Sequence, residues 1–203
     1  MKDSQKLAIF GSSGHAFDIQ STFLKMYPNG KVAFIKSDQE NYYVEKYSNS
    51  GYGFIIGIGD NRKRKSIAEK YKNLNWVSVI SDSAFIGHGT TFEEGNFVGF
   101  GVFISHNVKV SKHTIINANS TVGHDTVLCD YSHVCTNVSI GGNGVIIEKG
   151  AFLGSSVVII NKSISVGEWS QISFGSVVSK SISAKKLFQQ YRKDIILPTF
   201  NKS

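Results

Sequence analysis

The chain has 203 residues, enough for one medium domain or two small ones, and its 41% hydrophobic content is sufficient for a packed core. It has no apolar run long enough to cross a bilayer, and its first ten residues are too short and polar for a signal peptide, so we expect a cytoplasmic protein without membrane insertion. The net charge of +7 suits nucleic acid or small phosphorylated ligands, and because the sequence has no nucleic-acid motif we expect the latter.

The N-terminal stretch predicts a strand, a glycine-rich turn and a helix. Lys6 to Phe10 is a short apolar run, Gly-Ser-Ser-Gly-His follows at 11–15, and an amphipathic stretch then continues through Met26. Backbone N–H groups at the start of such a helix attract phosphate. The third glycine of a dinucleotide fingerprint is absent, which argues against NAD binding.

Two further strands are predicted, at Lys31 to Ile35 and at Gly53 to Ile58, with a basic helix from Arg62 to about Lys72. Alternating strands and helices indicate a small parallel sheet, and we assign residues 1–76 to this βαβ, Rossmann-like domain. For the charges of Arg62 to Lys65 we favour a solvated helix face over a ligand-binding role.

From Ile80 to Val178 an aliphatic or aromatic residue recurs at nearly every sixth position. The period continues after an insertion at residues 141–144 and a later slip of one residue. So short a period indicates a parallel β-solenoid, whose units bury their apolar residues only by stacking on their neighbours. The positions are Ile80, Ile86, Phe92, Val98, Ile104, Val110, Ile116, Val122, Leu128, Val134, Ile140, Ile147, Leu153, Ile159, Val166, Ile172 and Val178.

We assign residues 77–180 to this solenoid and 181–203 to a C-terminal cap or tail. The stretch after Val178 could form a short helix, which would cover the open end of the solenoid. Cys129 and Cys135 are six residues apart, so they should lie on neighbouring faces of one coil. That separation argues against a disulfide, and we expect two reduced structural thiols.

Three of the six histidines, His88, His106 and His124, are eighteen residues apart and each lies two residues after an inward position. If residues eighteen apart stack, these side chains form a ladder, with about 4.8 Å between rungs. The next rung is Gly142, which leaves space for a substrate beside His124. Stacked imidazoles without carboxylates are not an obvious metal site, and we expect none.

Several of these motifs together resemble a known family. The Gly-Ser-Ser-Gly-His turn, the hexapeptide repeat and the sequences Val-Gly-His-Asp and Tyr-Ser-His-Val are similar to those of bacterial sugar acetyltransferases, including bacillosamine-type N-acetyltransferases and sialic-acid O-acetyltransferase-like proteins. The resemblance covers roughly Lys6 to Lys180. It implies a left-handed parallel β-helix, a homotrimer, and acetyl-CoA as co-substrate, bound between neighbouring β-helices.

The resemblance also implies roles for individual residues. His124 would be the general base, supported by Asp125, while His133, Gly142, Gly154 and Gly175 would bind acetyl-CoA. The nucleotide part of a sugar would lie in the N-terminal domain. The residues implied there are Gly11, Ser13, Gly14, His15, Asp38, Gly59 and Asn61.

Two features depart from the family pattern. Lys36, Ser37 and Asp38 replace the usual acidic pair after the second strand, which leaves the identity of the nucleotide base open. The Gly-x-Pro-Ala-Lys ending common in hexapeptide acetyltransferases is missing from this sequence. The resemblance therefore assigns no residues to the adenine of CoA.

The sequence therefore predicts N-acetylation of a UDP- or dTDP-linked amino sugar for surface-glycan biosynthesis, by direct attack on the thioester. Two alternatives stay open: O-acetylation of a sugar hydroxyl, and a non-catalytic nucleotide-sugar-binding scaffold. Which sugar is used, and whether the acyl group is larger than acetyl, do not follow from the sequence.

Overall fold

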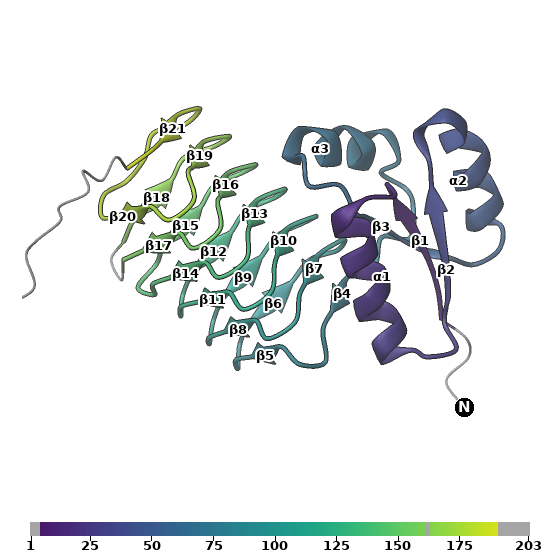
Figure 1. Cartoon of the computed structure of the whole chain (residues 1–203), viewed down its shortest axis with the longest axis horizontal. Coiled ribbons are helices and arrows are strands. Elements are labelled where there is room, and N and C mark those ends of the chain that lie inside the picture. The colour runs from purple at the N-terminus through teal and green to yellow at the C-terminus, as the bar shows by residue number, and fades with distance from the viewer. Residues whose placement is uncertain (1–4, 161–162, 191–203) are drawn as a thin grey trace, which may run out of the picture.

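A computed structural model describes residues 5–160 and 163–190 and consists of a small α/β domain joined to a long β-helix (Figure 1). The N-terminal domain has a parallel sheet in the order β2-β1-β3. Strands β1 and β2 have the predicted bounds, whereas β3 ends two residues early. The elements are β1 (Lys6–Phe10), α1 (Gly14–Met26), β2 (Lys31–Ile35), the 3-10 turn η1 (Ser37–Gln39), α2 (Glu40–Ser48), β3 (Gly53–Ile56) and α3 (Asn61–Lys70).

Helix α2 is absent from the sequence prediction, for a visible reason. Val44 is its only buried residue, and the tyrosines around it lie at intermediate or exposed positions. A helix with one buried position has almost no apolar periodicity to detect.

The β-helix has three faces, each built from two-residue strands that pair in parallel with the coils before and after. The first face contains β4 (Val79–Ile80), β7 (Phe97–Val98), β10 (Ile115–Ile116), β13 (His133–Val134), β16 (Phe152–Leu153), β19 (Gln171–Ile172) and β21 (Leu187–Phe188). The second contains β5 (Phe85–Ile86), β8 (Phe103–Ile104), β11 (Thr121–Val122), β14 (Ser139–Ile140), β17 (Val158–Ile159) and β20 (Val177–Val178). The third contains β6 (Thr91–Phe92), β9 (Lys109–Val110), β12 (Val127–Leu128), β15 (Ile146–Ile147) and β18 (Ser165–Val166).

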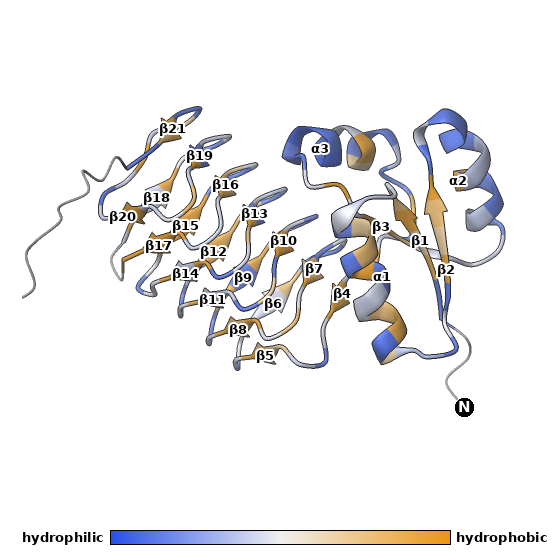
Figure 2. Cartoon of the chain, in the orientation of Figure 1, coloured by the Kyte–Doolittle hydropathy of each residue, from blue (hydrophilic) through white to orange (hydrophobic). Residues whose placement is uncertain are grey.

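The predicted inward positions are the second residues of these strands, and they form one continuous core along the axis. Most of the strands that carry them are hydrophobic (Figure 2). Residues eighteen apart pair before the insertion, as Thr121 does with Phe103, and residues nineteen apart pair after it, as Val127 does with Ile146. The predicted fold class, a βαβ domain followed by a parallel β-helix of hexapeptide repeats, is confirmed.

The corners between faces repeat as regularly as the strands. We call the turns that follow the first, second and third faces the first, second and third corners. Several corner residues have left-handed backbone, where asparagine and aspartate are tolerated better than most residues. They recur every six positions, at Asn107, His113, Asn119, Asp125, Tyr131 and Asn137, with φ between 54° and 59°.

The helix predicted after Val178 is wrong within the described residues, because the chain continues the β-helix there. Ile182 bridges to Val166, and β21 pairs with β19. Ile182 and Phe188 are six residues apart and pack on the core, so the hexapeptide period persists after a shortened spacing. The rest of the predicted C-terminal segment, from residue 191, lies outside the described residues.

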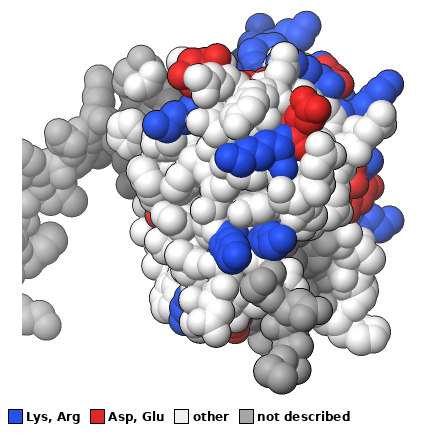
Figure 3. Space-filling model, turned by 90° about the vertical axis from the view of Figure 1, so that its right-hand side faces the viewer, with Lys and Arg blue, Asp and Glu red and all other residues white. Residues whose placement is uncertain are grey.

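The N-terminal domain packs on the first face where the β-helix begins, at strands β4, β7 and β10. Outward residues Val79, Phe97 and Ile115 form one apolar cluster with side chains of β1 and α1. On the end of the molecule formed by this domain, lysine and arginine side chains are interspersed with carboxylates (Figure 3). None of the described helices combines the length and the apolar character that crossing a membrane requires.

Candidate active site

His124 and Asp125 lie at the second corner, directly after β11. The His124 Nδ1–H donates to Asp125 Oδ2 at 2.8 Å. This hydrogen bond is the largest cause of the lowered pKa of the Asp125 carboxyl. With Nδ1 carrying the proton, Nε2 of the neutral ring has a free lone pair, and among the described residues it has no hydrogen-bond partner. The pair is therefore arranged as a general base and the carboxylate that orients it.

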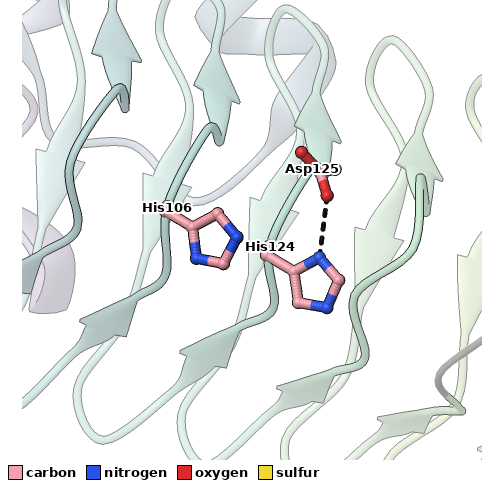
Figure 4. A group of neighbouring side chains, drawn as sticks. All are labelled: His106, His124 and Asp125. Carbon is pink, nitrogen blue, oxygen red and sulfur yellow. Dashed lines mark hydrogen bonds and ion pairs between the residues drawn. The ribbon is translucent and has the colours of Figure 1, made fainter.

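Of the predicted histidine ladder, the step from His106 to His124 is present. The rings of His106 and His124 are parallel, 5.1 Å apart between centroids and inclined by 2° (Figure 4). Gly142 lies on the other side of His124, and a Cβ added to it would come 2.6 Å from His124 Cδ2. Any side chain there would displace the ring, so glycine at this position lets His124 keep its orientation. Among the described residues no such ring contact joins His88 to His106.

One ligand atom from each of His106, His124 and Asp125 lies within 4.8 Å of the others, a spacing that a metal ion could bridge. The two imidazole rings are stacked parallel, however, with centroids 5.1 Å apart, and the lone pairs of a ring lie in its plane. One cation cannot lie in both planes at once. This geometry favours acid–base chemistry over metal binding.

Three of the predicted nucleotide-binding residues line one cavity of about 700 Å³ at the carboxyl ends of β1 and β2. These are Gly11, Ser13 and Asp38. Lys36 and Lys63 line the same cavity, and Gly14 begins α1 beside it with no atom within 4 Å of where a Cβ would lie. Two ammonium groups next to a helix N-terminus make a favourable place for phosphate.

The other three predicted nucleotide-binding residues face the β-helix instead. Asn61 is buried, and its Nδ2 donates to the carbonyls of Gly150 and Ala151 at 3.0 and 3.2 Å. His15 contacts the ring of His133 edge-on at 5.0 Å. Gly59 lies against His15, so close that a Cβ there would be 2.8 Å from the His15 ring. These residues form part of the contact between the two domains.

His133 is at the centre of this contact and is only 2% exposed. Its Nδ1–H donates to the Gly59 carbonyl at 3.0 Å, and its Nε2 accepts from Asn117 at 3.1 Å. Burial lowers the pKa of His133 to about 3, with Arg64 as the next cause. The ring is therefore neutral at physiological pH, and both of its nitrogens are occupied within the protein.

Gly154 and Gly175, predicted to bind acetyl-CoA, line a second cavity of about 570 Å³ at the first corner. A Cβ on Gly154 would come 2.7 Å from the Phe174 backbone nitrogen, so the coils approach too closely there for a larger residue. Phe174, Leu187 and Cys135 also line this cavity. Gly142 is at the second corner with His124, so the predicted donor-binding glycines are divided between two corners.

Arg64 contradicts the prediction of a solvated helix face. It is 1% exposed, and its guanidinium donates to five carbonyls at 2.8 to 3.2 Å, which lie on both domains. Burial lowers its pKa to about 9. Nothing in the charged run 62–65 distinguishes this arginine from its neighbours, because its partners are backbone carbonyls and three of the five are at least 49 residues away. The acceptors are the carbonyls of Ile58, Gly59, His113, Tyr131 and Ser132.

Residues 6–71 match the PglD N-terminal domain family. Over 120 residues, 59% of this chain, the sequence is 30% identical to the bifunctional protein GlmU of Aquifex aeolicus. The chain spans about a quarter (24%) of the length of that relative.

Two solved structures share the fold over nearly the whole chain. PerB from Caulobacter crescentus, in complex with CoA and GDP-perosamine, superposes with a TM-score of 0.82 at 24% identity over 89% of this chain and 91% of its own. The acetyltransferase domain of PglB from Neisseria gonorrhoeae, in complex with acetyl coenzyme A, gives 0.82 at 19% identity over 89% and 93%. Residues 6–71 of this chain are therefore similar to the PglD N-terminal domain family, and the chain as a whole shares its fold with these two solved structures.

Proposed function

We propose that this protein transfers the acetyl group of acetyl-CoA to an amine on a nucleotide-linked sugar. The observation that carries the proposal is the His124–Asp125 pair, whose free Nε2 lies beside the space left by Gly142. Solved proteins of this fold with CoA, acetyl coenzyme A or GDP-perosamine bound support the same chemistry. Since acetyl-CoA is the donor, we place the reaction in the cytoplasm.

In this mechanism the substrate nitrogen attacks the thioester carbon while His124 Nε2 accepts the amine proton. The C–N bond forms, the C–S bond breaks, and the CoA thiolate takes the proton from the His124 imidazolium and leaves as a thiol. Asp125 keeps the ring in the tautomer that leaves Nε2 free and stabilises the imidazolium that forms. A positioned base of this kind contributes about 10²–10⁴ in rate. The backbone N–H of Gly142 is our candidate donor to the developing oxyanion.

The proposed donor site requires more than one copy of the chain. His124 is at the second corner, whereas Gly154 and Gly175 line the cavity at the first, so a neighbouring molecule must bring a base to each donor. The second face between these corners exposes Phe85 (57%) and Phe103 (43%), stacked at 4.9 Å, which a second copy can cover. We therefore propose a homotrimer, in which each donor cavity faces the base of a neighbouring copy.

The cavity of the N-terminal domain is the proposed nucleotide site. Lys36 and Lys63 offer charge to a diphosphate, and Asp38 offers a carboxylate to a base or ribose. Our expectation of a UDP or dTDP carrier stays a proposal, since PerB binds a GDP sugar. His133 and Asn61 make hydrogen bonds between the two domains. They would thereby fix the position of the nucleotide cavity relative to the acetyl group of bound acetyl-CoA.

The decisive experiment follows thiol release from acetyl-CoA with paired acceptors. UDP-, dTDP- and GDP-linked amino sugars are each compared with the matching hydroxy sugar. Turnover confined to amino sugars would support N-acetylation. Comparable rates on both members of a pair would favour O-acetylation, and binding of acetyl-CoA without turnover on any acceptor would favour a scaffold. Sedimentation tests the trimer, which a fully active monomer would exclude.

A further inference from the structure

The His124–Asp125 pair is exposed enough to need support. The His124 side chain is 35% exposed and that of Asp125 is 50% exposed. A contact between two such side chains at a surface contributes little by itself, because both can rotate away. A base that acts with good efficiency must keep one tautomer and one ring orientation. Something beyond the pair must therefore restrain it.

The coil before the pair supplies two contacts that do this. Asn107 Nδ2 donates to Asp125 Oδ1 at 3.3 Å, while the other carboxylate oxygen accepts from His124. The carboxylate is thus held at both oxygens. The His106 ring is parallel to the His124 ring, with centroids 5.1 Å apart, and limits its rotation.

The backbone holds these four residues in register. Asp125 N–H donates to the His106 carbonyl at 3.2 Å, and Asn107 N–H donates to the His88 carbonyl at 3.0 Å. Asn107 and Asp125 share the left-handed conformation, with φ of 57° and 58°, so their side chains leave the coil in the same direction. The His106 ring is itself fixed by Ser105, whose Oγ lies 3.3 Å from His106 Nδ1.

We infer that Asn107 and His106 are positioning residues, which hold the His124–Asp125 pair in the orientation that proton acceptance requires. This inference rests on the proposed function, since it assigns His124 the part of the base. Asn107 acts by holding the Asp125 carboxylate, and His106 acts by restraining the His124 ring. Neither side chain needs to touch the substrate.

Asn107→Gly tests the first contact, since glycine keeps the left-handed backbone and removes only the amide. We expect kcat to fall about five- to tenfold with both KM values within twofold of wild type. The matched control is Lys185→Gly, at an exposed position with φ of 58° on the third corner, away from the pair and from the donor cavity. It should leave kcat unchanged.

A double variant separates positioning from a general structural effect. If Asn107 acts through Asp125, then adding Asn107→Gly to Asp125→Ala should cause no further loss of kcat. An additional five- to tenfold loss in that background, or wild-type kcat in Asn107→Gly alone, would overturn the inference.

For His106 the informative comparison is between two replacements. His106→Ala removes the flat surface and should lower kcat about three- to tenfold, whereas His106→Phe restores an aromatic ring and should recover most of it. His88→Ala, one coil further away, is the control. Equal losses in the alanine and phenylalanine variants would show that stacking is not what His106 provides.

Imidazole ¹⁵N chemical shifts give a readout independent of turnover. Wild-type His124 should show a protonated Nδ1 and a bare Nε2, and Asn107→Gly should shift both resonances toward a mixture of tautomers. Unchanged shifts in the variant would overturn the inference. A wild-type protein that acetylates no acceptor, but shows these shifts, would refute the proposed function and leave the positioning role standing.

Discussion

Two corners of the β-helix stack aromatic rings in nearly the same way and use them differently. At the second corner His106 and His124 are parallel within 2°, and at the third corner His113 and Tyr131 are also parallel within 2°. The second corner is partly open to solvent, whereas His113 is 3% exposed beneath the N-terminal domain. Burial lowers the pKa of His113 to about 4. The repeat stacks the rings in the same way at both corners. Whether a corner is open to solvent or covered by the N-terminal domain decides if its imidazole can act on a substrate.

The largest effect that this comparison predicts is on catalysis. His124→Ala should lower turnover by about two to four orders of magnitude, because the proton acceptor is lost, and leave the circular dichroism spectrum and oligomer size unchanged. The matched variant His113→Asn removes an imidazole from the covered corner and tolerates left-handed backbone. It should retain turnover. Near-wild-type activity in His124→Ala would remove this residue from the mechanism.

The contact that covers the third corner depends on Arg64. Arg64→Met should lower the free energy of unfolding by at least about 3 kcal/mol, because buried carbonyls lose their donors. Lysine has no planar fork with five donors, so Arg64→Lys should not restore stability. Lys65→Ala, on the same helix, should change it by less than about 0.5 kcal/mol. Urea unfolding measures all three, and a neutral Arg64→Met would contradict the interdomain role.

Acid should weaken the covered corner. The pKa of His113 falls from 6.5 to about 4 on folding and that of His133 to about 3, so the unfolded chain binds protons that the folded chain does not. Stability is therefore complete above pH 6.5 and decreases as pH falls from 6.5 toward 4. At pH 5 each histidine accounts for a loss of about 2 kcal/mol.

Thermal unfolding of wild type and His113→Asn between pH 7.5 and 5 measures this effect. The variant should show a shallower decrease, because one of the two buried imidazoles is gone. An identical slope in the two proteins would show that His113 is not protonated on unfolding in this range.

The mildest effect lies outside both corners. Gly14→Asp places a carboxylate at the start of α1 without a steric clash, since no atom lies within 4 Å of its Cβ position. It should raise KM for the sugar nucleotide about tenfold through repulsion of the phosphates and leave acetyl-CoA binding nearly intact. Gly14→Ala is the uncharged control. An equal loss of affinity for both ligands would mean that the turn has only a structural role.

Much of this architecture is predictable because it is local. The first two strands, the first helix and the inward positions of the solenoid follow from periodicities that need no distant contact to be recognised. Since residues eighteen apart stack, the ladder of His106 and His124 and the gap at Gly142 follow as well. Helix α2 was not predicted because it has a single buried residue. The last coil was not predicted because the spacing of inward residues shortens from six to four between Val178 and Ile182.

The sequence by itself determined the β-helix core, the parallel sheet of the N-terminal domain and the placement of His124 beside a glycine. Only the tertiary structure decided which polar groups are buried between the domains. His133, Asn61 and Arg64 all bond to backbone atoms at least 49 residues away across that contact. A backbone carbonyl is the same in every residue, so such a partner leaves no mark on the sequence. Its position is defined only when the two domains meet.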